Sequence, residues 1–166
     1  MIPKQQLLDL MVFECNVCKH LFKKIPKGKM NYRPGKKMRS TLELLRYISF
    51  CGTECSRIIL LDSFKTQQWQ EYETAAKKSE KLQPGGFLKA MDAQIRDLKK
   101  LYAKIPEKDF ARRKITMPLG GTLPLGEAML LTTARFMSGY RMQLFIYAKA
   151  SGNGKIGTKE CWFGRS

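Results

Sequence analysis

The strongest constraint on the fold is the spacing of the apolar side chains, which recur at helical intervals in four long stretches separated by proline and glycine. The stripe of the first stretch consists of Leu7, Met11, Cys15, Cys18, Phe22 and Ile25. The pattern predicts long helices over residues 3–25, 40–63, 87–105 and 124–150. The chain has few alternating β-branched runs and no heptad repeat sustained over many turns. We therefore expect an all-α fold, a four-helix bundle.

Local signals refine the ends of these helices and their connections. Ser40 and Glu43 have the spacing of a capping box, in which each side chain bonds to the main-chain N–H of the other residue. Residues 64–83 are polar and rich in helix formers, so we expect a shorter helix or helical crossover with Trp69 and Tyr72 turned inward. Because this segment is too long for a tight turn, at least one connection of the bundle must be a crossover.

The remaining segments fit a single domain over residues 1–166. A chain of 166 residues has the length of one domain, and an apolar content of 43% argues against disorder. The stretch "MPLGGTLP" is interpreted as a turn followed by the start of a helix, because its glycines are too irregular for a phosphate-binding loop. The tail, which contains Trp162 and Phe163, is predicted to pack back on the bundle.

The basic residues are unevenly distributed, in a chain whose formal net charge is +17. No acidic residue occurs between Cys15 and Leu42. The basic residues in this interval are Lys19, Lys23, Lys24, Lys27, Lys29, Arg33, Lys36, Lys37 and Arg39. Such a segment attracts nucleic acid or anionic lipid non-specifically. Only Tyr32 is available there to stack on bases, so a solvated loop is the favoured interpretation and nucleic-acid binding an alternative.

The compartment is inferred from the absence of membrane and secretion signals. No apolar run reaches the roughly 18 residues of a membrane span, and "MIPKQQLLDL" lacks the pattern of a signal peptide. We expect a soluble, cytoplasmic protein with no membrane partner. The five cysteines are Cys15, Cys18, Cys51, Cys55 and Cys161. An odd number without a signal peptide favours free thiols, and mid-helix positions favour core packing over a thiolate metal site.

The last predicted helix has the layout of an active site in a helical bundle. Phe136, Tyr140, Gln143 and Tyr147 recur at steps of four, three and four residues. None of these side chains is an ordinary metal ligand or activates a nucleophile.

Two motifs carry a resemblance to a known family. "MNYRPGKKMRSTLELLRYIS" resembles the start of the second helix in the DinB/YfiT-like superfamily, where a tyrosine-arginine-proline run and a short linker precede a capped helix. "YRMQLFIYAKASG" resembles the end of the last long helix of that family. The resemblance implies a DinB-like four-helix bundle, and because members are often dimeric it also implies a homodimer.

Many members of this family are implied to hold a divalent metal with three histidines, one on the second helix and two on the last. Those positions fall on Tyr47, Phe136 and Tyr140 of this chain. Zinc and nickel prefer imidazole, thiolate or carboxylate ligands, and the one histidine, His20, lies on the first predicted helix. We therefore expect that the metal site is lost, with no metal and no other cofactor.

The aromatic residues at this position predict either a ligand pocket or a closed core. The expected pocket residues are Tyr47, Cys51, Phe136, Tyr140 and Gln143. Such a pocket suits a small apolar or aromatic ligand, and Gln143 is expected to be the partner of the Tyr140 hydroxyl. The favoured function is a non-catalytic or small-molecule-binding protein of unknown ligand. The alternative is a family-type thiol-dependent transferase or hydrolase that uses Cys51 or Glu54; Glu54 is otherwise expected to pair with Arg57.

Overall fold

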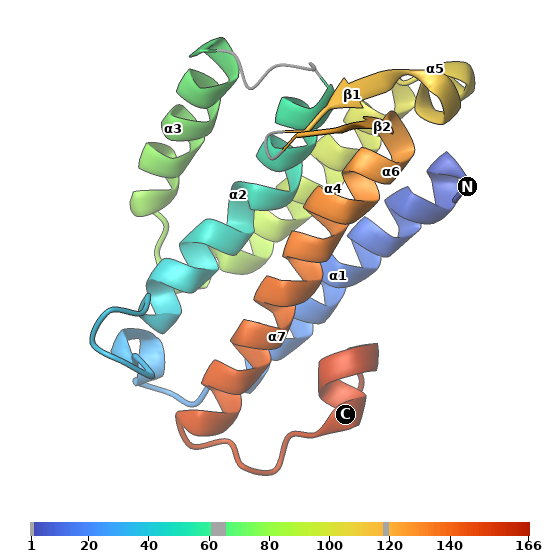
Figure 1. Cartoon of the computed structure of the whole chain (residues 1–166). Helices are drawn as coiled ribbons and strands as arrows, with labels where there is room; N and C mark the ends of the chain where they lie inside the picture. Colours follow the sequence, from blue (N-terminus) through green and yellow to red (C-terminus); the bar gives the residue numbers. More distant parts are fainter. Residues whose placement is uncertain (1, 61–65, 118–119) are drawn as a thin grey trace.

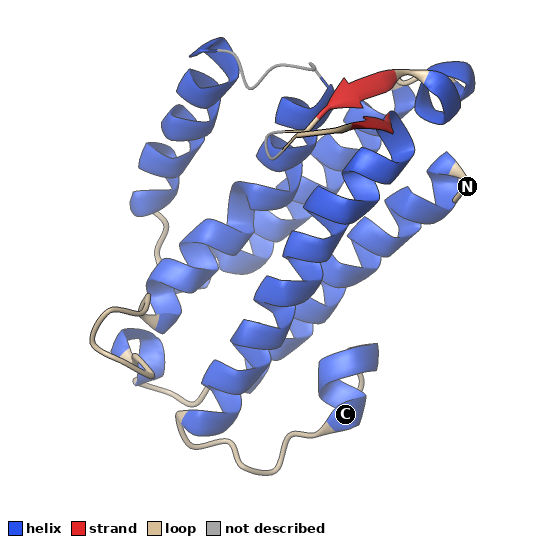
Figure 2. Ribbon diagram, viewed as in Figure 1, coloured by secondary structure: helices blue, strands red, loops and turns tan. Residues whose placement is uncertain are grey.

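The structure, a computed structural model, describes residues 2–60, 66–117 and 120–166. Long helices lie side by side and form the body of the molecule (Figures 1 and 2). They are α1 (Lys4–Lys24), α2 (Thr41–Leu60), α4 (Phe87–Ala103) and a last helix formed by α6 (Leu125–Met129), the π-helical turn η3 (Leu130–Ala134) and α7 (Arg135–Ala150). Helices α1 and α2 each pack against both α4 and α7. The predicted all-α four-helix bundle is confirmed.

Shorter elements connect the long helices. They are η1 (Lys29–Asn31), α3 (Thr66–Glu80), η2 (Pro84–Gly86), α5 (Glu107–Arg112), β1 (Lys114–Thr116), β2 (Thr122–Pro124) and η4 (Lys159–Phe163). Strands β1 and β2 pair in antiparallel fashion, with Ile115 opposite Leu123. The sequence interpretation, a turn and the start of a helix, did not foresee this small hairpin. The positive φ angles of Gly120 (91°) and Gly121 (83°) explain why glycine suits the turn.

Helix α3 confirms the predicted helical crossover, and it lies to one side of the bundle (Figure 1). Its main packing partner is α2. The Tyr72 side chain is partly buried and its ring packs against Phe50 of α2. The expectation that Trp69 turns inward is wrong, because this side chain is 44% exposed. A helix that packs mainly against one neighbour buries only a narrow face, and Trp69 lies at the margin of that face.

The tail packs back on the bundle, mainly through a cysteine. Element η4 packs against α1 and α7, and its buried residue is Cys161. The expectation that the tail packs back on the bundle is confirmed, although Trp162 and Phe163 themselves are 50% and 59% exposed. Trp162 still contacts the bundle at its edge, where the guanidinium carbon of Arg141 lies 4.6 Å from the ring centroid.

A buried ion pair joins the first helix, the last helix and the tail. Nε of Arg141 donates to Oε2 of Glu14 at 2.6 Å, and Oγ of Ser138 donates to Oε1 of Glu14 at 2.7 Å. Nη1 of Arg141 also donates to the main-chain oxygen of Cys161 at 2.6 Å. The side chains of Glu14 and Arg141 are only 5% and 4% exposed. A buried charge with several hydrogen bonds fixes the relative position of its elements, because separation would leave it unpaired.

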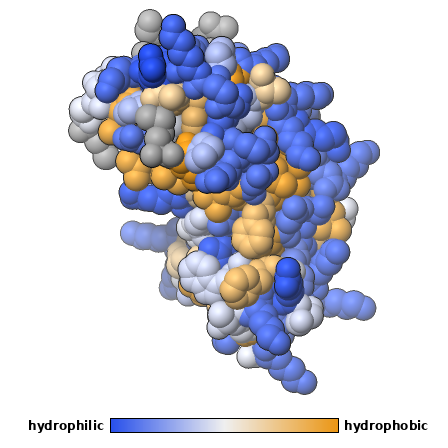
Figure 3. All heavy atoms as spheres, turned by 90° about the vertical axis from the view of Figure 1, so that its right-hand side faces the viewer, coloured by the Kyte–Doolittle hydropathy of each residue, from blue (hydrophilic) through white to orange (hydrophobic). Residues whose placement is uncertain are grey.

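The surface combines many charged side chains with scattered apolar ones. Figure 3 shows apolar patches among hydrophilic side chains on one face. The large apolar side chains exposed among the described residues include Phe13, Leu131, Phe136, Ile146, Trp162 and Phe163. No helix in the described part of the chain is both long enough and apolar enough to cross a membrane.

Two glycines provide a matched test of the packing around the last helix. A Cβ atom at Gly126 would lie 2.6 Å from Cε1 of the buried Phe110 ring, whereas a Cβ at Gly139 would meet nothing within 4 Å. We expect Gly126→Ala to lower the free energy of unfolding by about 1–3 kcal/mol through overpacking. Gly139→Ala should raise it by up to about 1 kcal/mol, because alanine favours the helix. Urea denaturation measures both, and equal effects of the two substitutions would contradict this packing.

Candidate functional site

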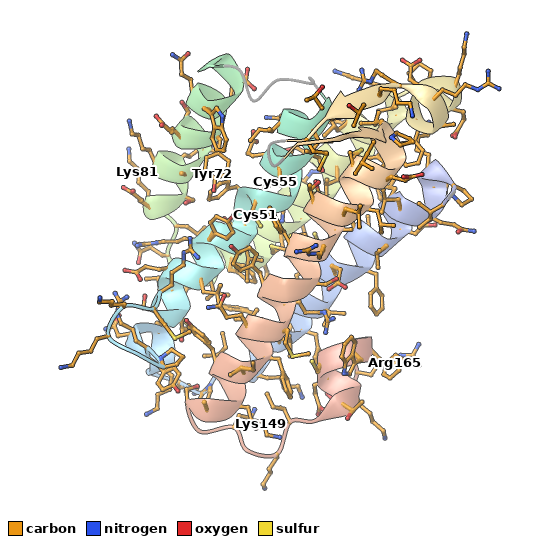
Figure 4. The ribbon with its side chains drawn as sticks, viewed as in Figure 1. Cys51, Cys55, Tyr72, Lys81, Lys149 and Arg165 are labelled. Atoms are coloured by element: carbon orange, nitrogen blue, oxygen red, sulfur yellow. The ribbon has the colours of Figure 1, made fainter. Side chains whose placement is uncertain are left out.

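One face of α2 and the facing side of α3 line a cavity of about 490 Å³ that is open to solvent. The residues from α2 and the segment before it are Arg39, Glu43, Arg46, Tyr47 and Phe50. The four that lie on α2 (Glu43, Arg46, Tyr47 and Phe50) are within one or two turns of one another and share a helix face. The residues from α3 are Tyr72, Ala76, Ser79 and Glu80. Figure 4 shows the Tyr72 side chain between α3 and α2. Ala76 and Ser79 of α3 have small side chains, which leave this space open between the two helices.

A continuous row of aromatic rings, the aromatic row, runs from α7 through α2 to α3. Its members are Tyr140, Tyr47, Phe50, Tyr72 and Trp69. The Tyr47 and Tyr140 centroids are 4.6 Å apart, with an interplanar angle of 58°. The next contacts are Tyr47 to Phe50 at 5.5 Å, Phe50 to Tyr72 at 5.4 Å and Tyr72 to Trp69 at 5.8 Å. These distances lie in the range of favourable aromatic pairs, so the row is a rigid apolar wall.

The phenol of Tyr47 remains protonated within this row. Burial is the largest of the effects that raise its pKa far above the ordinary value, and the neighbouring Cys51 and the hydroxyls of Tyr72 and Tyr140 add to it. Burial likewise raises the pKa of Tyr72. Both groups therefore act as neutral hydrogen-bonding groups and not as bases or anionic ligands.

Arg39 covers the edge of the aromatic row. Its guanidinium carbon lies 4.5 Å from the Tyr47 centroid and 6.0 Å from the Tyr140 centroid, both within the range of a cation–π contact. The Tyr147 hydroxyl donates to the main-chain oxygen of Arg39 at 3.0 Å, and it accepts a hydrogen bond from the Gln143 amide at 3.1 Å. The segment that carries Arg39 is thus tied to α7.

Glu43 is fully engaged beside this cavity. The main-chain N–H of Ser40 donates to its carboxylate at 2.7 Å, and Oγ of Ser40 accepts from the Glu43 N–H at 3.2 Å, which confirms the predicted capping box. Arg33 donates two further hydrogen bonds to the same carboxylate, each at 2.8 Å. These bonds, with those from Arg33 first, lower the pKa of Glu43, which stays ionised and paired.

Four of the five side chains expected at the site take three different positions. Tyr47 and Tyr140 are in direct contact, and Tyr47 lines the cavity. Cys51 is buried behind them, where its thiol contacts the Met137 sulfur at 3.5 Å. Phe136 is 45% exposed and is not part of the aromatic row.

Gln143 also differs from its expected role. Its amide donates to the Tyr147 hydroxyl, one turn further along α7, instead of serving Tyr140. Within a helix a side chain meets those three or four residues away on either side, so the spacing alone did not decide between the two tyrosines.

The cysteines have the environment of core residues. Burial, the largest effect, raises the pKa of Cys15 to about 12 and that of Cys55 to about 11. It raises the pKa of Cys18 and Cys51 well above the ordinary value. No cluster of three or more His, Cys, Asp or Glu side chains that could hold a metal ion occurs among the residues that the structure describes.

Glu54 pairs with Arg57 as the sequence spacing suggested, with 2.9 Å between Oε1 of Glu54 and Nη1 of Arg57. The Glu54 side chain is 10% exposed, and burial raises the pKa of its carboxyl despite the opposing effect of Arg57. Glu54 lines a second hollow with Thr53 and Gln94 and does not line the cavity of Tyr47.

Several residues of the cavity were not singled out from the sequence. Phe50 and Arg46 each lie within one turn of Tyr47, so the helical spacing of α2 could have identified them. Arg39 precedes the helix, and its position over Tyr47 depends on the path of the connector, which no local pattern specifies.

Comparisons with known proteins identify a similar fold, but they identify no sequence family. No family model and no curated protein matches the chain. Among solved structures, a DinB-like protein, YjoA, from Bacillus subtilis is similar over 89% of this chain and 92% of its own, with a TM-score of 0.67 and 17% identity. This likeness confirms the fold that the two sequence motifs predicted: the chain has the DinB-like fold.

Proposed function

We propose that this chain is a binding protein that holds a small, partly apolar ligand between α2 and α3 and does not catalyse a reaction on it. The observation that carries the proposal is the aromatic wall formed by Tyr47, Phe50 and Tyr72 beside a cavity of about 490 Å³. Small-molecule sites are concave, have volumes of roughly 300–1,000 Å³, and combine apolar walls with a few polar groups.

The donor atoms near this wall do not suit the metal that the family resemblance implies. Phe136 has no donor atom, and its side chain is 45% exposed. Tyr47 is a phenol whose pKa burial raises, so it does not supply an anionic oxygen. Tyr140 is in ring contact with Tyr47 at 4.6 Å. These groups do not fit a divalent metal, and the proposed function is binding of a ligand by the aromatic wall.

The thiols support a binding protein over a thiol-dependent enzyme. A thiolate is the nucleophilic form of cysteine, and catalytic cysteines have a pKa lowered by a nearby cation or helix N-terminus. Burial raises the pKa of Cys51, and its thiol is directed at Met137 in the core. The group that the alternative function needs is thus protonated and inaccessible.

We predict that Cys51 of the folded protein resists alkylation by iodoacetamide at pH 8, because it is buried and its pKa is raised. The partly exposed Cys55 should react faster, and in urea all cysteines should react. Peptide mass spectrometry at timed intervals measures each site. Rapid alkylation of Cys51 in the folded protein would favour the transferase alternative.

Binding itself is tested with aromatic fragments. Indole derivatives should give saturation-transfer NMR signals with the wild-type protein, and Tyr72→Ala should weaken their affinity by roughly tenfold or more, since it removes one wall of the cavity. Phe13→Ala is the matched control, because Phe13 is an exposed aromatic residue on α1 away from this cavity. Circular dichroism should show that both variants are folded. Equal affinities of wild type and Tyr72→Ala would contradict the proposal.

A further inference from the structure

Arg39 has hydrogen-bonding capacity that the described residues do not use. Its side chain is exposed at the cavity, and its contacts there are with the rings of Tyr47 and Tyr140. It forms no ion pair with a described carboxylate. A guanidinium that stacks on a ring keeps its N–H groups in its own plane, pointing outward from the edge of the stack. Those donors have the planar fork geometry that binds a carboxylate with two parallel hydrogen bonds.

A second guanidinium lines the same cavity. Arg46 lies on α2, whereas Arg39 lies in the segment before that helix, and both line the cavity. Nε of Arg46 donates to the main-chain oxygen of Leu82 at 3.1 Å, which holds the side chain in place against the end of α3. Like Arg39, it forms no ion pair with a described carboxylate.

The acidic residues of the cavity do not cancel this charge. Glu43 is already neutralised by its two hydrogen bonds from Arg33. Glu80, on α3, is then the remaining carboxylate among the lining residues, against the two guanidinium groups of Arg39 and Arg46. A surplus of one positive charge is therefore left at the cavity. The formal net charge of the whole protein is +17, and the local surplus and the overall charge both favour a negatively charged ligand.

We infer that the ligand is an aromatic carboxylate, with its ring against Tyr47 and Tyr72 and its carboxylate on the N–H groups of Arg39. This inference rests on the proposed binding function and adds the charge of the ligand and the residue that selects it. The contact with the Tyr47 ring places the guanidinium at the cavity before the ligand arrives, which reduces the side-chain freedom lost on binding. Arg46, on α2, adds a second positive charge at the cavity that attracts the same carboxylate.

Three probes of one shape and different charge test this inference: indole-3-acetate (anionic), indole-3-acetamide (neutral) and tryptamine (cationic). Isothermal titration calorimetry at pH 7 and fixed ionic strength should give indole-3-acetate an affinity roughly tenfold or more above that of indole-3-acetamide, because its hydrogen bonds are charge-assisted. Tryptamine should bind most weakly. Arg39→Gln should abolish the preference for the anion, and Lys37→Gln, which removes a nearby exposed charge that does not line the cavity, should preserve it.

The remaining outcomes separate this inference from the proposed function. Equal affinities for the three probes, together with a loss of affinity in Tyr72→Ala, would overturn the anionic ligand and leave the aromatic pocket intact. A preference for the anion that survives Arg39→Gln, or that falls equally in Lys37→Gln, would show non-specific attraction by the basic surface and overturn the role of Arg39. Binding of all probes that is insensitive to Tyr72→Ala would overturn both.

Discussion

The contact between the Tyr47 and Tyr140 rings, at 4.6 Å, determines what the space between α2 and α7 can hold. Two large side chains fill this space from opposite helices, and burial keeps the Tyr47 phenol neutral. The rest of the site follows from this contact. It orients the Tyr47 ring so that Arg39 stacks on it, and it begins the row of rings that continues through Phe50 to α3. The open space of the molecule at this point therefore lies between α2 and α3.

The bundle could be predicted because its determinants are local. Apolar residues at helical spacing and proline or glycine between them define the long helices, and the bonds between Ser40 and Glu43 begin α2 where the capping box predicted. The exposure of Trp69 was not predictable in this way, because it depends on how much of α3 its neighbours cover. The pair of Glu14 and Arg141 is another such case: the residues are 127 positions apart, and only the fold brings them together.

The site was predictable in part, and for the same reason. Helical spacing and the family resemblance together pointed to Tyr47 and Tyr140, which are in contact. The connector before α2 carries Arg39, and its path depends on several contacts that are distant in sequence, including the bond from Tyr147 to the main chain of Arg39. The basic segment of residues 19–39 thus includes two arginines with separate tasks. Arg33 neutralises Glu43, and Arg39 covers the aromatic row.

The central claim is that Tyr47 and Tyr140 fill the space between α2 and α7 with rings that do not suit a divalent metal, and that the proposed organic ligand binds in the neighbouring cavity between α2 and α3. The most direct test is to equilibrate the purified protein with zinc or nickel, remove free metal by gel filtration and measure the retained metal by inductively coupled plasma mass spectrometry. The account predicts substoichiometric metal, unchanged by Tyr140→Phe, because that substitution removes only a phenol oxygen, which is not a ligand that zinc prefers. A full equivalent of metal that is retained by the wild type and lost in Tyr140→Phe would contradict it.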